Sequence, residues 1–344
     1  MIDANTVLTA LYMSACQTIV GDIRISLTTT LTSVSLPSLT YAGSLLVVEN
    51  HQNLATISFP ALLYVGNALQ IDGNPALITL AFPLLTSVAV DVYLVQNNMQ
   101  NGTISFPMLQ SIGSALSVGG NNAAFMSFPS LSTVAGDFII SNHALVGVDF
   151  SKLVSVDGDL DISINTALTS LVLEALTRVG GAFVLNGNAA TVVSFPVLAN
   201  VGGYFELSSN VNVTNASFGS LQYVGNSFYV FGNTVLYNTS FRSLAEVNYV
   251  FEVYDNPTVA ALDFPSFTTL LSRFYVINNV KLRNISIPHI AYVGEYIQIC
   301  GNAPSLVFPL AILQVLNHFA SSLTFCVFLC FVFSHLALLS ASLH

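Results

Sequence analysis

Hydrophobic and polar positions repeat along this chain with a period of about 23 residues. Residues 59–83 read FPALLYVGNALQIDGNPALITLAFP, so this segment begins and ends on the same Phe-Pro pair. Repeats of this length are typical of solenoids, in which each turn stacks on the next. Aligned on the Phe-Pro corner, the turns begin at Leu36, Phe59, Phe82, Phe106, Phe128, Phe150, Leu173, Phe195, Phe218, Phe241, Phe264 and Ile287, and a partial turn follows at Phe308.

Each repeat contains an alternating segment, such as Leu69-Gln70-Ile71 or Phe251-Glu252-Val253. A period of two predicts a short strand whose first and third residues face inward. The Pro after the opening aromatic residue favours a corner, and the Val-Gly pair lets the chain turn where a side chain would clash. The opening aromatic residues are expected to stack as an internal spine, because stacked rings bury a large apolar area. This predicted spine comprises Phe59, Phe82, Phe106, Phe128, Phe150, Phe195, Phe218, Phe241 and Phe264.

Every full turn also supplies one Asn at the end of the alternating segment. Buried turns leave backbone groups unpaired, and an Asn side chain offers both a donor and an acceptor. The column therefore predicts a hydrogen-bonded ladder rather than a set of ligand contacts. Its members are Asn50, Asn74, Asn97, Asn121, Asn142, Asn165, Asn188, Asn210, Asn233, Asn256, Asn279 and Asn302.

These columns together predict an all-β fold, a parallel β-solenoid over residues 16–310. Stacking at ~4.8 Å per turn makes the solenoid a rod of about 55 to 60 Å. Cys16 and Cys300 would then lie near opposite ends, far beyond the ~7 Å limit for a disulfide. The other two cysteines, Cys326 and Cys330, fall in an apolar tail, so the four form neither a disulfide framework nor a metal site.

The repeat resembles the receptor L-domain family, which is of leucine-rich-repeat type. The segment CQTIVGDIRI, residues 16–25, is similar to that family's opening Cys-x-x-Ile-x-Gly-Asp-Leu-x-Ile. The nearest resemblance is to fungal GPI-anchored cell-wall-organisation proteins built from L-domain repeats. The resemblance implies a right-handed solenoid and a role in cell-wall or cell-surface organisation. It brings no catalytic residues and no cofactor, and the expected partner of the capping cysteine is missing.

Charge and composition narrow the set of expected partners. The chain is 53% hydrophobic and 7% charged, which excludes disorder. Its net charge is -10 and its seven basic residues form no cluster, so nucleic acid is not an expected partner. The histidines show no metal-ligand spacing. Five Asn-x-Ser/Thr sequons occur, at Asn101, Asn212, Asn215, Asn238 and Asn284, and they predict a glycoprotein.

The two ends of the sequence suggest export and attachment. Residues 1–15 are either an atypical leader or a truncated region, since Asp3 stands where a signal peptide carries a positive residue. The apolar tail, residues 311–344, contains a stretch from Phe319 to Leu343 without Asp, Glu, Lys or Arg. Such a stretch fits a GPI signal or a transmembrane helix, and both alternatives stay open. Either one predicts a membrane-tethered protein at the plasma membrane or cell wall.

Two surfaces are candidates for activity. Asp157, Asp159 and Asp161 alternate and would share the outward side of one strand, beside Asp137, but Gly-Asp also recurs as a turn element of the repeat. The second surface is an aromatic and acidic set of outward positions, where ligand binding and mere support of neighbouring strands are both open interpretations. Its residues are Tyr229, Phe231, Glu252, Tyr254 and Tyr275, whereas earlier turns carry Ser117, Gly119, Ser141 and Ser163.

The sequence therefore predicts a non-enzymatic cell-surface glycoprotein. The alternative is an adhesion or receptor-type ectodomain that binds a surface protein or a cell-wall glycan through the outward strand face. A third hypothesis is a carbohydrate-active β-helix enzyme that uses the aspartate cluster.

Overall fold

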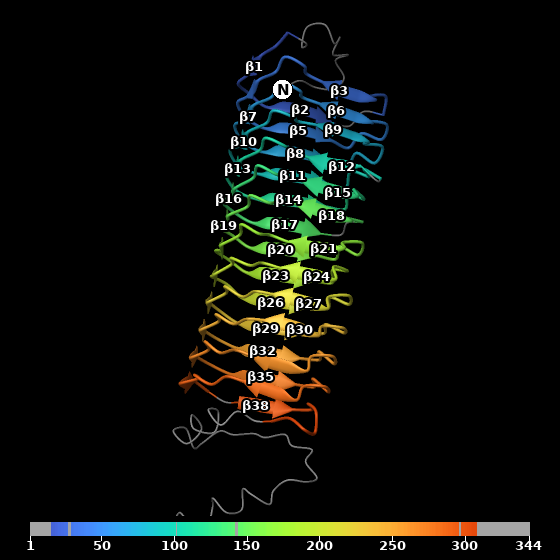
Figure 1. The fold of residues 1–344 in the computed structure, drawn as a ribbon. Coiled ribbons are helices and arrows are strands. Elements are labelled where there is room, and N and C mark those ends of the chain that lie inside the picture. The colour runs from blue at the N-terminus through green and yellow to red at the C-terminus, as the bar shows by residue number, and fades with distance from the viewer. Residues whose placement is uncertain (1–14, 27–28, 101, 142–143, 296, 308–344) are drawn as a thin grey trace, which may run out of the picture.

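Stacked parallel strands wind into a β-solenoid, as the sequence predicted (Figure 1). The computed structural model describes residues 15–26, 29–100, 102–141, 144–295 and 297–307. Within these ranges the chain is all-β and contains no helix. Three strands of each turn lie on three faces, called here the short-strand sheet, the long-strand sheet and the third face. The predicted ends, residues 1–15 and 311–344, fall almost entirely outside the described residues, and so does the start of the partial turn at Phe308.

The short-strand sheet has 13 described strands of two residues each. They are β1 (Thr18–Ile19), β4 (Tyr41–Ala42), β7 (Tyr64–Val65), β10 (Ser87–Val88), β13 (Ser111–Ile112), β16 (Thr133–Val134), β19 (Ser155–Val156), β22 (Arg178–Val179), β25 (Asn200–Val201), β28 (Tyr223–Val224), β31 (Glu246–Val247), β34 (Thr269–Leu270) and β37 (Tyr292–Val293).

The long-strand sheet has 13 described strands of four residues each. They are β2 (Ile23–Ser26), β5 (Leu46–Glu49), β8 (Leu69–Asp72), β11 (Val92–Val95), β14 (Leu116–Gly119), β17 (Phe138–Ser141), β20 (Leu160–Ser163), β23 (Phe183–Asn186), β26 (Phe205–Ser208), β29 (Phe228–Phe231), β32 (Phe251–Tyr254), β35 (Phe274–Ile277) and β38 (Ile297–Cys300).

The third face is divided into four groups of three-residue strands. The first two groups are β3 (Ser33–Ser35), β6 (Thr56–Ser58) and β9 (Thr79–Ala81), then β12 (Thr103–Ser105), β15 (Phe125–Ser127) and β18 (Gly147–Asp149). The others are β21 (Ser170–Val172), β24 (Val192–Ser194), β27 (Asn215–Ser217) and β30 (Asn238–Ser240), then β33 (Ala261–Asp263) and β36 (Asn284–Ser286). An isolated parallel bridge joins Asn284 to Val307 after the last of them.

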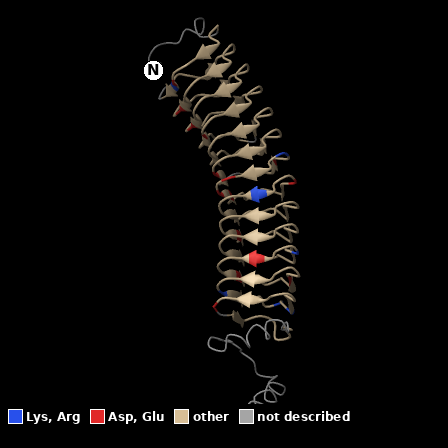
Figure 2. Ribbon diagram, turned by 90° about the vertical axis from the view of Figure 1, so that its left-hand side faces the viewer, with Lys and Arg blue, Asp and Glu red and all other residues tan. Residues whose placement is uncertain are grey.

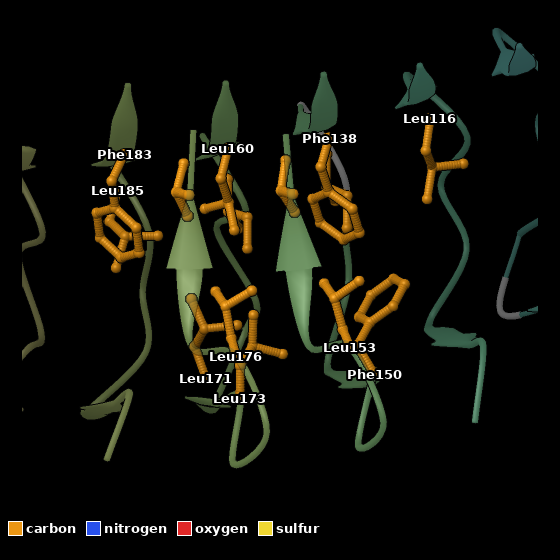
Figure 3. Packing of buried hydrophobic residues seen from close by; sticks show 14 of the residues in the cluster. Leu116, Phe138, Phe150, Leu153, Leu160, Leu171, Leu173, Leu176, Phe183 and Leu185 are labelled. Carbon is orange, nitrogen blue, oxygen red and sulfur yellow. The ribbon is translucent and has the colours of Figure 1, made fainter. Parts of the chain in front are cut away.

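The register keeps like positions together from turn to turn. Leu69 of β8 pairs with Val92 of β11, which pairs with Leu116 of β14. The first and third residues of the long strands are buried and the second is partly exposed in nearly every turn, as the period of two predicted. Figure 3 shows side chains from successive long strands pointing into the interior, where they meet leucines and Phe150 from the opposite side.

The opening aromatic residues form the predicted spine. Each of them is buried, and neighbouring rings stack: Phe59 on Phe82 at 5.2 Å and Phe106 on Phe128 at 5.1 Å between centroids. The stack is interrupted at Leu173, which takes the ring's place in one turn, and resumes from Phe195 onto Phe218 at 5.3 Å. Offset stacking at such distances stabilises each turn against its neighbours.

A second aromatic stack runs only through the later turns. It occupies the first inward position of the long strands and comprises Phe183, Phe205, Phe228, Phe251 and Phe274, with centroids 4.8 to 5.0 Å apart. Its rings meet the first spine edge to face, as Phe228 meets Phe241 at 4.9 Å and 85°. Earlier turns carry Leu46, Leu69, Val92 and Leu116 in this column. The core is therefore doubly aromatic from β23 to β35.

The Asn column forms the predicted ladder. Asn256, for example, donates from Nδ2 to the Val230 carbonyl at 2.9 Å and accepts the Asn233 backbone N–H at 3.1 Å. The fully buried members are Asn74, Asn97, Asn121, Asn165, Asn188, Asn210, Asn233, Asn256 and Asn279, and Asn302 ends the column. Asn142 lies outside the described residues.

The prediction for Asn50 was wrong, because His51 takes the ladder position in that turn. The backbone N–H of His51 donates to Oδ1 of Asn74 at 3.2 Å, and its Nε2 donates to the Ile25 carbonyl at 3.1 Å. Asn50 is exposed, with a φ of 60°. Its place is the left-handed corner that Gly73 and Gly120 fill in other turns. Asn tolerates that conformation better than most residues do.

The close approach of successive turns explains why the Val-Gly corner carries glycine. A methyl group at Gly66 would collide with the backbone carbonyl of Gly43, and one at Gly225 would collide with that of Gly202. The corner therefore lets successive turns stack without displacement. Seen from the side, the stack curves at its N-terminal end and runs straighter through the later turns (Figure 2).

Candidate functional site

The long-strand sheet brings all five predicted binding residues onto one surface. Tyr229, Glu252 and Tyr275 are register partners at the second strand position, and Phe231 pairs with Tyr254 at the fourth. All five are partly exposed. We call these five residues the aromatic patch.

Ring geometry limits what the patch can offer. Phe231 and Tyr254 stack with centroids 4.7 Å apart and planes within 4° of parallel. Each ring therefore covers a face of the other, as in cross-strand pairs that support a sheet. This geometry favours the support interpretation for this pair, and both residues remain partly exposed.

Tyr204 belongs beside the patch and was missed by sequence reasoning. Its ring meets that of Tyr229 edge to face at 6.4 Å, and 37% of the residue is exposed. Tyr204 directly precedes the inward Phe205 in the chain, so extending the period of two by one residue would have found it.

The two glutamates of this surface differ in their partners. Glu206 accepts hydrogen bonds from the Ser208 hydroxyl at 2.5 Å and from Asn186 Nδ2 at 3.4 Å. No described hydrogen bond or ion pair reaches the carboxylate of Glu252. Burial raises the pKa of Glu252 above its usual range. Burial and the charge of Glu252 raise the pKa of Tyr254 as well. The surface is therefore negatively charged and only partly solvated.

Small residues occupy several of these positions in earlier turns, although Tyr93 stands at the second position of β11. Gly119 pairs with Ser141, and Ser141 pairs with Ser163, along the fourth position, as the sequence predicted. Ser117 occupies the second position of β14. Aromatic side chains thus gather on the later turns of the sheet.

The aspartate cluster is not arranged as predicted. Asp161 alone lies in a long strand, at the outward second position of β20. Asp157 follows β19 and Asp159 precedes β20, because the corner at Gly158 separates the two strands. The alternation therefore places no three carboxylates on one strand.

Two of these carboxylates serve the stacking of turns. Asp137 Oδ1 accepts the backbone N–H of Asp159 at 2.9 Å, and Asp159 Oδ1 accepts that of Ala182 at 2.6 Å. Asp157 pairs with Arg178 at 3.1 Å. The turn-element interpretation of Gly-Asp is confirmed for Asp137 and Asp159, and Figure 2 shows acidic residues following one another along the left-hand edge of the rod.

Asp161 has a more perturbed setting. Burial raises its pKa and the nearby carboxylates of Glu206 and Asp159 raise it further, against a hydrogen bond from the Ser163 hydroxyl that lowers it. Among the described residues, no group of three or more His, Cys, Asp or Glu is placed to hold a metal ion.

The sequons lie on a different face from the aromatic patch. Asn215, Asn238 and Asn284 are the first residues of β27, β30 and β36, and all three are exposed. Asn215 and Asn238 are register partners, and Nδ2 of Asn238 donates to Oδ1 of Asn215 at 2.9 Å. Asn212 is exposed in the tight turn just before β27, and Asn101 lies outside the described residues.

A hollow of about 330 Å³ lies beside the paired sequons. Its lining includes Asn215, Asn238, Arg242 and Asp263, at the place where the third face breaks between β30 and β33. The hollow opens on the sequon side of the molecule, and its lining mixes polar side chains with apolar surface.

Neither the described cysteines nor a search for membrane-spanning helices adds a candidate site. Neither Cys16 nor Cys300 takes part in a disulfide within the described residues. Cys326 and Cys330 lie outside the described residues. A search of the described ranges finds no helix that is long and apolar enough to cross a membrane.

Comparisons with known proteins do not place the chain in a family. No protein-family model, curated protein or solved structure matches it. The arrangement of residues on the solenoid therefore carries the functional argument.

Proposed function

We propose that this chain is a non-enzymatic cell-surface glycoprotein with a role in cell-wall or cell-surface organisation. The supporting observation is the separation of two kinds of surface. Exposed sequon asparagines follow one another on the third face, while the aromatic patch lies on the long-strand sheet. Glycans on the third face would leave the long-strand sheet open to a partner.

The absence of enzymatic activity is part of this proposal. Asp137 and Asp159 each accept a hydrogen bond from a backbone N–H group of the next turn, and this contact suits a structural role. General acid–base catalysis needs a carboxyl group within reach of the reacting bond, on a surface open to substrate.

Attachment to a membrane is proposed from the sequence alone. The apolar stretch from Phe319 to Leu343 would serve as a GPI signal or a spanning helix. Release of the protein from membranes by a phosphatidylinositol-specific phospholipase would support the GPI anchor. A requirement for detergent would support the helix, and free secretion would contradict tethering.

Glycopeptide mapping tests the central part of the proposal. Expression in a eukaryotic secretory host should yield N-glycans at Asn215, Asn238 or Asn284, and Asn→Gln variants should each remove the corresponding glycan. Asn226→Gln, an exposed Asn outside any sequon, is the matched control. Full secretion with all sequons bare would contradict the proposal.

An adhesion or receptor-type ectodomain is the second candidate, and the aromatic patch favours it. Tyr and Phe side chains are enriched at protein interfaces. Binding to cell surfaces or immobilised glycans that disappears in Tyr254→Ala but persists in Tyr237→Ala would support this function. Tyr237 is 61% exposed next to the third face, so it controls for loss of an unrelated Tyr. Unchanged binding in Tyr254→Ala would show that the aromatic patch does not bind this ligand.

A further inference from the structure

Carboxylates recur at every second turn in one column of the long-strand sheet. Asp161 pairs with Val184 and Val184 pairs with Glu206, so the two acids lie two turns apart. Glu206 pairs with Tyr229 and Tyr229 pairs with Glu252, which repeats the interval. Two strand spacings amount to about 9.6 Å. We call Asp161, Glu206 and Glu252 the carboxylate column.

The surface around the carboxylate column contains no compensating base. None of the outward positions of β20, β23, β26, β29, β32 and β35 is Lys or Arg. Arg273 directly precedes β35, but it pairs with Glu295 at 2.5 Å. Arg178 lies on the short-strand sheet and pairs with Asp157 at 3.1 Å. A partner that meets this surface must supply the positive charge itself.

The aromatic rings favour a protein over a sugar as this partner. Sugars bind aromatic residues through an open ring face, and Phe231 and Tyr254 each cover one face of the other. The partly exposed side chains of this surface are aromatic residues and carboxylates. Aromatic residues are enriched at protein interfaces, and the carboxylates would complement a basic partner.

The spacing of the carboxylates favours one conformation of that partner. A polyproline II helix repeats every three residues and rises 3.1 Å per residue, so like side chains recur about every 9.3 Å along one side. This interval matches the ~9.6 Å between members of the carboxylate column. An antiparallel or parallel strand would present alternate residues at about 6.6 Å instead.

We propose that the long-strand sheet from β20 to β32 binds an extended basic protein segment with Lys or Arg at every third residue. The segment lies along the rod axis, its cationic side chains meet Asp161, Glu206 and Glu252, and its intervening residues contact Val184 and Tyr229. This inference rests on the second candidate function and names the ligand class for that surface.

The experiment uses the full chain expressed in a eukaryotic secretory host and two labelled peptides of equal charge. One is (Lys-Pro-Pro)4, and the other has its four Lys residues together at one end. Fluorescence anisotropy at 150 mM salt measures both affinities. The spaced peptide is expected to bind about fivefold more tightly, because only it reaches all three carboxylates at once.

Two double variants isolate the carboxylate column. Glu206→Gln with Glu252→Gln should weaken binding of the spaced peptide about tenfold. Glu174→Gln with Asp263→Asn removes the same charge from exposed positions away from the long-strand sheet and should change affinity less than about twofold. Urea denaturation confirms that both double variants stay folded.

Three outcomes overturn the inference. Equal affinity for the two peptides would show that binding depends only on the overall negative charge of the protein. An equal loss of affinity in both double variants would show the same. Tighter binding of an amino-sugar oligomer than of the spaced peptide would assign the surface to a cationic glycan. Glycopeptide mapping is independent of all three, so the proposed glycoprotein function stands or fails separately.

Discussion

The earlier and later turns of this rod share one scaffold and differ in what they add to it. From β5 to β14 the first inward position of the long strands holds Leu or Val, and from β23 to β35 it holds Phe. The outward positions change over nearly the same span, from Ser117 and Gly119 to Tyr229 and Tyr254. The Asn ladder runs through both regions.

This difference separates residues that hold the stack together from residues that give it a surface. A doubly aromatic core supports the long strands that carry the aromatic patch. Binding sites on well-packed strands hold their geometry better than sites on loops. The later turns therefore combine the more aromatic core with the more aromatic exterior.

Removing one ring from the second stack should have the largest effect. Phe228→Ala is expected to lower the free energy of unfolding by about 3–5 kcal/mol, since Phe228 stacks on Phe205 and Phe251 and meets Phe241 edge to face. Leu69→Ala, at the same column in an earlier turn, should cost about 1 kcal/mol less. Urea denaturation of both variants measures the difference, and an equal or larger loss for Leu69→Ala would remove the distinction between the two cores.

The ladder should respond alike in both regions. Asn74→Ala and Asn233→Ala are each expected to cost about 2–3 kcal/mol, because each leaves buried backbone groups without partners. Thermal unfolding of the pair provides the comparison. A gap of more than about 1 kcal/mol between them would mean that the ladder is not a uniform element of the scaffold.

The smallest expected effect is on pH dependence. Burial raises the pKa of Glu252, so the folded state holds this proton more tightly than the unfolded chain does. The associated stability is present below the unfolded-state pKa and is lost as pH rises through the folded-state pKa. Glu252→Gln should therefore reduce the fall in stability over that interval, by well under ~1 kcal/mol because the group is partly solvated.

Asp263→Asn, at an exposed carboxylate on the third face, serves as the control for the pH series. Denaturation midpoints across the acid range should separate the two variants. Identical pH profiles for Glu252→Gln and the unchanged protein would contradict the assignment of Glu252 to a partly desolvated surface.

Much of the scaffold could be predicted from the sequence, because stacking forces each column to keep its chemistry. The Phe-Pro spine and the strand at Leu69–Asp72 are examples. Asn50 was misassigned because two polar residues, Asn50 and His51, stand side by side after β5. Which of them enters the ladder depends on where β5 ends. The run from Asp157 to Asp161 alternates in sequence, yet a corner interrupts it.

The surface was less predictable than the core. Periodicity places Phe231 and Tyr254 on one side, but it does not say that their rings cover each other. The ring contacts between adjacent turns supply that information. The repeat implies that Asp161, Glu206 and Glu252 lie two turns apart, and the register of five strands confirms that they share one column.

Hydroxyl-radical footprinting with the spaced (Lys-Pro-Pro)4 peptide tests most directly whether recognition is confined to the later turns. Oxidation of Tyr229 and Tyr254 should fall when the peptide binds, while oxidation of Tyr93 on β11 and of the exposed Tyr237 should stay unchanged. Equal protection of all four tyrosines, or protection of Tyr93 alone, would contradict the account.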